Sequence, residues 1–258
     1  MPQTLYNKFY EKNAHILLTY IKNTNQKEIL VKNIINRLSS SFRLDGQDFV
    51  FSDIGAGDGA VTIPVIDFLK DKTRLACHII EPSDLMDIFK KNCALKNMTY
   101  YKEKVDEVKV AKSDFILASH VIFLLDDYEK TIKNLYASLK KDGILLIVET
   151  NKKSGDILLK MRSGQDFETL INFGWTDKME NFLKMNNIKY LIKVVSSDIV
   201  VSSCASLNAE GKAMISFFYH KPFEELTKGE IRGVLGAIKE LAKNGKLIKK
   251  ENYFWISK

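Results

Sequence analysis

Cysteine is scarce in this sequence, with only Cys77, Cys93 and Cys204. Three scattered cysteines do not form a disulfide framework, and no Cys/His group has the spacing of a zinc site. The sequence also lacks an apolar run of about eighteen residues and a basic segment followed by an apolar one. It therefore predicts neither a transmembrane helix nor a signal peptide. We expect a cytoplasmic protein without a bound metal.

Arginine is rare as well, since only five of the 39 basic residues are arginines. The net charge is +7 and the isoelectric point is about 9.0, values that are compatible with nucleic-acid binding. The lysines, however, are spread along the chain, and the densest group is Lys246, Lys249 and Lys250. We favour a solvated lysine-rich surface over a nucleic-acid surface and expect no membrane partner.

Apolar runs and helical patterns alternate through the first half of the chain. Strands are predicted at 49–54, 75–80, 98–102, 114–119 and 143–149. Helices are predicted at 60–70, 83–95 and 127–141. Alternation at this spacing is typical of a parallel sheet with right-handed crossovers. The sequence therefore predicts an α/β fold, with Asp142 and Gly143 ending the third helix and starting the fifth strand.

The first strand is followed by a glycine turn. Phe49–Ile54 is apolar and β-prone, and Gly55, Gly57 and Gly59 come next. Glycine adopts positive φ and has no Cβ to hold a ligand away. Residues 61–70 then have helical periodicity. A strand, a glycine turn and a helix in this order are typical of the opening of a nucleotide-binding unit.

The residues around this turn indicate which ligand it binds. Glu81 ends the second strand, where an acidic residue can hold ribose hydroxyls; a solvated strand end is the alternative. A dinucleotide site has its third glycine one residue later than Gly59. Asp53 and Asp58 flank the turn, and carboxylates repel a pyrophosphate but suit a cation. These features favour a cationic adenosine ligand without phosphate.

The segment Asp53–Gly59 resembles motif I of class I S-adenosylmethionine-dependent methyltransferases, and Glu81 resembles their acidic ribose ligand. The resemblance covers roughly residues 45–150. It implies a Rossmann-like sheet of seven mostly parallel strands with flanking helices, and S-adenosylmethionine as cofactor. The cofactor-binding residues that it implies are Asp53, Gly55, Ala56, Gly57, Gly59, Glu81, Pro82 and Ser119.

The end of the fourth strand is the second informative stretch. Ser119 and His120 follow the apolar run 114–118. Ligands of open α/β sheets bind beyond the carboxyl ends of the strands, where the strand order switches. In a methyltransferase this point lies between the first and fourth strands, where cofactor and acceptor meet. His120 is either a structural residue or a group that orients the acceptor and takes its proton.

Further elements are predicted outside this core. Two helices are expected within residues 5–40, and the first has an aromatic face that includes Tyr6, Tyr10 and Tyr20. That helix either packs on the sheet or forms a lid over the acceptor. After residue 150, helices are expected at 166–173, 176–186, 206–219 and 227–243. Strands are expected at 188–201 and 253–256. The sequence thus predicts an N-terminal helical cap and a helical insertion before the last strand.

Three features are similar to histamine N-methyltransferase and its relatives: Ile80–Ser83, the run from Asp114 to Asp127, and the helical insertion. This resemblance implies a small acceptor with an amine or imidazole nitrogen and a substrate site that includes Phe123 and His120. His120 stands where that family has a glutamine, a departure that argues against histamine itself. The family's N-terminal carboxylate has a counterpart in Glu28.

We predict a single methyltransferase domain with a cap at 1–45, a cofactor-binding core at 46–150 and a substrate-side part at 151–258. His120 is the candidate catalytic residue, with Tyr6, Tyr10, Tyr20 and Phe123 around the acceptor. One alternative is an RNA methyltransferase, although the Asn/Asp-Pro-Pro-aromatic signature is missing after the fourth strand. The other alternative is a non-catalytic binding module with the same fold.

Overall fold

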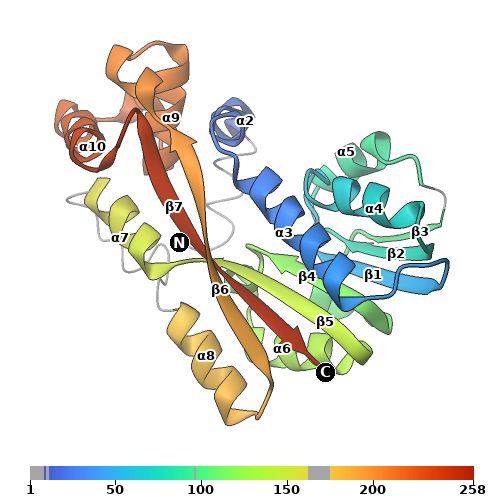
Figure 1. Cartoon of the computed structure of the whole chain (residues 1–258). Helices are drawn as coiled ribbons and strands as arrows, with labels where there is room; N and C mark the ends of the chain where they lie inside the picture. The colour runs from blue at the N-terminus through green and yellow to red at the C-terminus, as the bar shows by residue number, and fades with distance from the viewer. Residues whose placement is uncertain (1–8, 10–11, 96, 162–174) are drawn as a thin grey trace. The chain divides into compact units, whose positions relative to one another are not determined.

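The computed structural model describes residues 9, 12–95, 97–161 and 175–258 (Figure 1). The helices are α2 (Ala14–Lys22), α3 (Gln26–Ser41), α4 (Thr62–Lys70), α5 (Leu85–Asn92), α6 (Tyr128–Ala137), α7 (Lys152–Met161), α8 (Trp175–Met185), α9 (Ala209–Tyr219) and α10 (Lys228–Leu241). None of these described helices combines the length and the apolar character that crossing a membrane requires. Tyr6, Tyr10 and the helix expected at 166–173 lie outside the described residues.

The strands form one seven-stranded sheet with the order β3-β2-β1-β4-β5-β7-β6. They are β1 (Asp48–Ile54), β2 (Arg74–Ile80), β3 (Met98–Tyr101), β4 (Ser113–Ser119), β5 (Leu139–Thr150), β6 (Tyr190–Val200) and β7 (Lys246–Ser257). The pairs β1–β2, β1–β4, β2–β3 and β4–β5 are parallel. The predicted fold class, a Rossmann-like α/β sheet of seven mostly parallel strands, is therefore confirmed.

Contacts along the chain divide it into two compact units, each made of three segments. The sheet unit comprises Lys27–Glu149, Asp177–Lys193 and Asn252–Lys258. The helical unit comprises Met1–Gln26, Thr150–Thr176 and Val194–Glu251. Strands β6 and β7 contribute residues to both units. The functional division at residues 45 and 150 that we expect from the sequence stays a prediction.

The sheet unit buries apolar side chains on both faces of its strands. Ile54, Ile116 and Ile147 belong to a cluster that includes residues of α6 and α8. Phe51 and Phe115 stack on neighbouring strands with ring centroids 5.4 Å apart. Figure 1 shows α4 and α5 on one side of the sheet and α6 on the other. Parallel strands covered in this way have nearly continuous apolar sequences, which explains why these strands were predictable.

The start of β5 differs from the prediction. Helix α6 ends at Ala137 instead of 141, and β5 already begins at Leu139, which pairs with Ser113 of β4. The register of this pair shifts before Phe115, and Asp142 has a φ of 63°. A Cβ on Gly143 would lie 3.0 Å from the Ser113 carbonyl oxygen. Asp142 and Gly143 therefore form an irregularity within β5 and do not separate a helix from a strand. Aspartate is one of the residues that tolerate the left-handed backbone conformation seen at Asp142.

The core of the helical unit is built from α2, α9 and α10 with parts of β6 and β7. Tyr20 of α2 stacks on Phe217 of α9, with centroids 3.7 Å apart and planes 6° apart. Thr227 caps α10 in a capping box with Glu230, an arrangement that satisfies two of the unpaired N–H groups at a helix start. Helices α9 and α10 separate β6 from β7, so the helical insertion expected before the last strand is present.

A polar cluster is buried in the helical unit at the start of α3. The Nε2 of Gln26 donates to Glu251 over 2.6 Å, and the Nζ of Lys249 donates to the Oε1 of Gln26 over 2.8 Å. Lys249 also forms an ion pair with Glu251 at 3.2 Å. Burial alone would lower the pKa of Lys249, but Tyr20 and Glu251 outweigh it and raise the pKa. Lys246, Lys249 and Lys250, the densest group of lysines, all lie within β7.

Two glycines of the helical unit provide a test of its packing. A Cβ on Gly211 of α9 would lie 2.1 Å from the Ser203 carbonyl oxygen, whereas nothing lies within 4 Å of a Cβ on Gly236 of α10. We expect Gly211→Ala to lower the free energy of unfolding by roughly 3 kcal/mol or more, because the backbone has to move. Gly236→Ala should raise it by about 0.5–1 kcal/mol, through better helix propensity. Urea unfolding of both variants measures these changes, and equal effects would contradict the packing of α9.

Candidate functional site

The glycine turn follows β1 at the carboxyl edge of the sheet. The N–H of Gly55 donates to the Ile80 carbonyl over 2.8 Å, which joins the turn to the end of β2. The N–H of Gly59 donates to the Ala56 carbonyl over 3.1 Å and closes the turn ahead of α4. Gly55, Gly57 and Gly59 all have positive φ, with 57° at Gly57. This confirms the predicted succession of strand, glycine turn and helix.

The three glycines meet different surroundings. A Cβ on Gly55 would lie 2.9 Å from the Val121 side chain, and one on Gly59 would lie 2.8 Å from Ile63 and Phe89. These two glycines are therefore required by packing within the protein. A Cβ on Gly57 would have no neighbour nearer than Leu85, at 3.9 Å. Gly57 is thus the position where the missing side chain leaves open space beside the turn.

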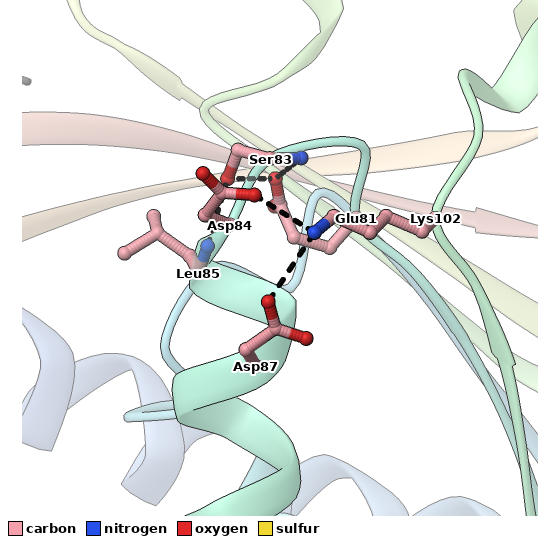
Figure 2. A network of polar contacts seen from close by, with 6 residues as sticks. All are labelled: Glu81, Ser83, Asp84, Leu85, Asp87 and Lys102. Atoms are coloured by element: carbon pink, nitrogen blue, oxygen red, sulfur yellow. Dashed lines mark hydrogen bonds and ion pairs between the residues drawn. The ribbon is translucent and has the colours of Figure 1, made fainter.

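Glu81 connects the glycine turn to the loop before α5, as Figure 2 shows for part of this network. Its Oε2 accepts a hydrogen bond from the Gly57 N–H over 2.9 Å. Its Oε1 accepts from the N–H of Ser83 over 2.9 Å and from the Ser83 hydroxyl over 2.6 Å. Glu81 is buried, with only 7% of its surface exposed. Glu81 therefore fixes the position of Gly57, and Ser83 in turn fixes Glu81.

Sequence reasoning missed the role of Ser83. Its Oγ also accepts a hydrogen bond from the Leu85 N–H over 3.3 Å, so it links Glu81 to the first residue of α5. A serine two residues after an acidic strand end favours such a local turn, and this was the available signal. Pro82 lies between the two residues and is exposed.

The start of α5 carries a second group of polar contacts (Figure 2). Lys102, just beyond β3, contacts Asp84 at 2.7 Å and Asp87 at 3.2 Å. These contacts lower the pKa of Asp84, but all three side chains are more than 40% exposed. Exposed ion pairs contribute little to stability. The group therefore joins β3 to α5 at the surface without the burial expected of a reactive centre.

Asp53 is buried at the end of β1, with 2% of its surface exposed. Its carboxylate accepts a hydrogen bond from the Thr62 hydroxyl at the start of α4. Burial raises the pKa of Asp53 to about 7; the Thr62 hydrogen bond opposes this rise, and the nearby Glu81 adds to it. In this structure Asp53 supports the turn through α4, and its direct contact with a cofactor stays a prediction.

The end of β4 lies against the same turn. Ser119 is the last residue of β4, and His120 follows with a φ of 56° while its N–H donates to the Val148 carbonyl over 2.9 Å. Val121 then packs against Gly55, as the space around that glycine shows. Phe123 lies in the short 3-10 helix Ile122–Leu124. Ser119, His120 and Phe123 are half-buried. The sheet unit thus brings the glycine turn, Glu81 and the residues after β4 to one edge.

Tyr20, the remaining candidate for the acceptor site, belongs to the helical unit. It is 8% exposed, stacks on Phe217, and its hydroxyl lies 3.5 Å from the Oε1 of Gln26. These contacts give it a packing role in that unit. Its expected contact with an acceptor stays a prediction, as do those of Tyr6 and Tyr10.

The raised pKa of Asp53 generates a prediction about stability. Folded Asp53 holds its proton with a pKa of about 7, whereas the ordinary value is 3.8. Ionisation therefore costs stability progressively as the pH rises between these values, and the cost is complete above about pH 7. The variant Asp53→Asn removes this cost. Relative to the parent it should gain up to roughly 4 kcal/mol between about pH 4 and pH 8.

Urea unfolding across that pH interval measures this gain. Asp48→Asn is the matched control, because Asp48 is exposed at the other end of the same strand and Arg74 lowers its pKa. Its effect on stability should be small and, if present, of the opposite sign. A pH-independent difference between Asp53→Asn and the parent would show that Asp53 is ionised in the folded protein throughout.

Comparisons with known proteins agree with this geometry. Residues 29–190 match a family model described as a methyltransferase domain. A malonyl-[acyl-carrier protein] O-methyltransferase of Bacillus anthracis is 20% identical over 190 residues, which cover 72% of this chain and 68% of that relative.

Solved structures share the fold. The plantazolicin methyltransferase BpumL, in complex with S-adenosylhomocysteine, has a TM-score of 0.60 at 14% identity and aligns over 98% of this chain and 93% of its own. The YcgJ protein of Bacillus subtilis has a TM-score of 0.56 at 14% identity, over 90% of this chain and 98% of its own. The family model covers well over half of the sequence. The chain therefore belongs to the methyltransferase domain family, whose methyl donor is S-adenosylmethionine.

Proposed function

We propose that this methyltransferase transfers the methyl group of S-adenosylmethionine to a small-molecule acceptor, at an amine or imidazole nitrogen. The observation that carries the proposal is the open space beside Gly57, whose N–H donates to Glu81, in a turn that packs against Val121 after β4. A ligand that occupies this space lies at the carboxyl edge of β1 and β4, where the strand order switches.

The residues present fit the donor. Gly57 leaves room for close approach, and Glu81 offers carboxylate oxygens beside it that can accept hydrogen bonds from ribose hydroxyls. In this proposal Gly55, Ala56 and Gly59 shape the turn, Asp53 supports it, and Pro82 and Ser119 border the adenosine. S-adenosylmethionine supplies an electrophilic methyl group when it is bound. Transfer would require the protein to hold the acceptor nitrogen close to that methyl group and to align the two.

His120 is the proposed catalytic residue. Its backbone is fixed by the hydrogen bond to Val148, and it follows the strand next to the one that carries the glycine turn. An amine that gains a methyl group has to lose a proton, and a neutral imidazole can accept one. Phe123, in the same unit, is proposed as an apolar wall of the acceptor site.

The acceptor class is supported by the resemblance to the histamine N-methyltransferase group, which stays a hypothesis. BamL, a plantazolicin methyltransferase with 13% identity and a TM-score of 0.52, is solved with a desmethylplantazolicin analogue. The relative from Bacillus anthracis is named for methylation of a malonyl-acyl-carrier protein. Peptide and carboxyl acceptors therefore belong in any test of the proposal, beside RNA.

The donor site is tested by Gly57→Ala. A Cβ there meets the protein only at an ordinary contact distance, so the fold tolerates it apart from the strain of a positive φ. The added methyl group occupies the ligand space, and we expect affinity for S-adenosylhomocysteine to fall about tenfold or more, roughly 1.4 kcal/mol. Calorimetry measures this change. Gly46→Ala is the control, since Gly46 also has positive φ and nothing within 4 Å. Equal affinities of both variants and the parent would remove Gly57 from the site.

The acceptor is tested with labelled S-adenosylmethionine. The protein is incubated with small amines and imidazoles, carboxylic acids, peptides and total RNA, and the label in each fraction is counted. We expect label in the amine and imidazole fraction. Label only in the peptide, carboxyl or RNA fraction would contradict the proposed acceptor class, but it would still demonstrate methyltransferase activity.

His120→Asn then tests the catalytic residue. Asparagine tolerates the left-handed backbone that His120 adopts, so the variant removes the imidazole with little strain. We expect kcat to fall about 10²-fold or more, as for loss of a general base, with nearly unchanged affinity for S-adenosylhomocysteine. His220→Asn is the control, because His220 has a φ of 51° in the helical unit. Full activity of His120→Asn would leave His120 a structural role only.

A further inference from the structure

An ion pair lies beside the glycine turn. The Nζ of Lys27, on the first turn of α3, is 3.2 Å from the Oδ1 of Asp58. The same oxygen accepts a hydrogen bond from the Ala60 N–H over 3.1 Å. The side chains of Lys27 and Asp58 are 34% and 33% exposed, so both charges are accessible to a ligand. Asp58 directly follows Gly57, the residue beside the open space.

We propose that Lys27 and Asp58 form the subsite for the amino-acid end of the methyl donor. That end is a zwitterion with one ammonium and one carboxylate. Asp58 takes the ammonium and Lys27 takes the carboxylate, so the ion pair within the protein is exchanged for two ion pairs with the ligand. The inference rests on the proposed function, because it assumes that the donor lies beside Gly57.

Exposure decides which carboxylate meets the ammonium. Asp53 is 2% exposed and bonded to Thr62, whereas Asp58 is one-third exposed. Exchange at Asp58 costs little, because ion pairs open to solvent contribute little to stability. A hydrogen bond between two charged groups in the more enclosed complex is stronger than one in solvent. Both facts favour exchange of the Lys27–Asp58 pair when the donor binds.

Lys27 lies on the first turn of α3, a regular helix, within the sheet unit. A charged group on an ordered backbone loses less conformational freedom when it captures a ligand. Lys32 lies on the same helix and is exposed, whereas Lys27 is paired with Asp58 beside the glycine turn. The contact with Asp58 therefore distinguishes Lys27 from exposed lysines such as Lys32.

Two ligands separate this subsite from the rest of the site. S-adenosylhomocysteine carries the zwitterion, and 5′-methylthioadenosine has the same adenosine and thioether without it. We expect the parent protein to bind the first at least tenfold more tightly. Lys27→Met should weaken binding of S-adenosylhomocysteine about tenfold and leave that of 5′-methylthioadenosine unchanged. Lys27→Arg should keep both affinities, because a guanidinium also pairs with a carboxylate. Calorimetry measures all of these constants, and Lys32→Met is the control for loss of one positive charge.

Each outcome decides one question. The zwitterion subsite would be overturned if the parent bound both ligands with equal affinity. It would also be overturned if Lys27→Met lowered the affinity for both ligands equally. Either result would leave the proposed donor site beside Gly57 intact. Binding of neither ligand by the parent would overturn the proposed function itself. Thermal unfolding checks that Lys27→Met is folded. Should it unfold, Asp58→Asn provides the same test from the other charge, with the same selective loss of S-adenosylhomocysteine expected.

Discussion

The hydrogen bond between Glu81 and the Gly57 N–H is the contact on which the site depends. It joins two loops that follow neighbouring parallel strands, and Glu81 as a whole is only 7% exposed. A buried carboxylate is costly unless it is hydrogen-bonded, and here Gly57 and Ser83 supply three donors. The glycine turn and the start of α5 are thus held in one arrangement by a single side chain. A ribose that binds Glu81 therefore donates its hydrogen bonds to a carboxylate whose position is already fixed.

The three glycines of the turn have different roles, two in packing and one in ligand binding. Gly55 admits Val121 from the segment after β4, and Gly59 admits Ile63 and Phe89. These contacts bring α4, α5 and β4 close to the turn, and only Gly57 faces open space. A motif that reads as one ligand signature in the sequence is therefore mostly a packing requirement. The ligand needs the absence of one side chain, while the fold needs the absence of two.

Much of the fold was predictable because the parallel strands are buried on both faces, and the glycine turn and Glu81 were predictable as a local pattern. The start of β5 was not, since the irregularity at Asp142 and Gly143 depends on a close approach to Ser113. The roles of Lys27 and Ser83 were not predicted either, because they depend on contacts that only the folded chain makes. A lysine far from the motif gains its role only from the fold that brings α3 to Asp58, across an interval of 31 residues. Charge composition alone could not single it out.

The buried cluster of Gln26, Lys249 and Glu251 positions the start of α3 against β7. Buried ion pairs give uncertain net stability, because removing two charges from water offsets their attraction. The cluster instead determines where α3 begins. Gln26 is hydrogen-bonded to both Lys249 and Glu251 of β7, which form an ion pair with each other. Within the helical unit, these polar contacts fix the first residue of α3 against β7, which no apolar residue of similar size would do.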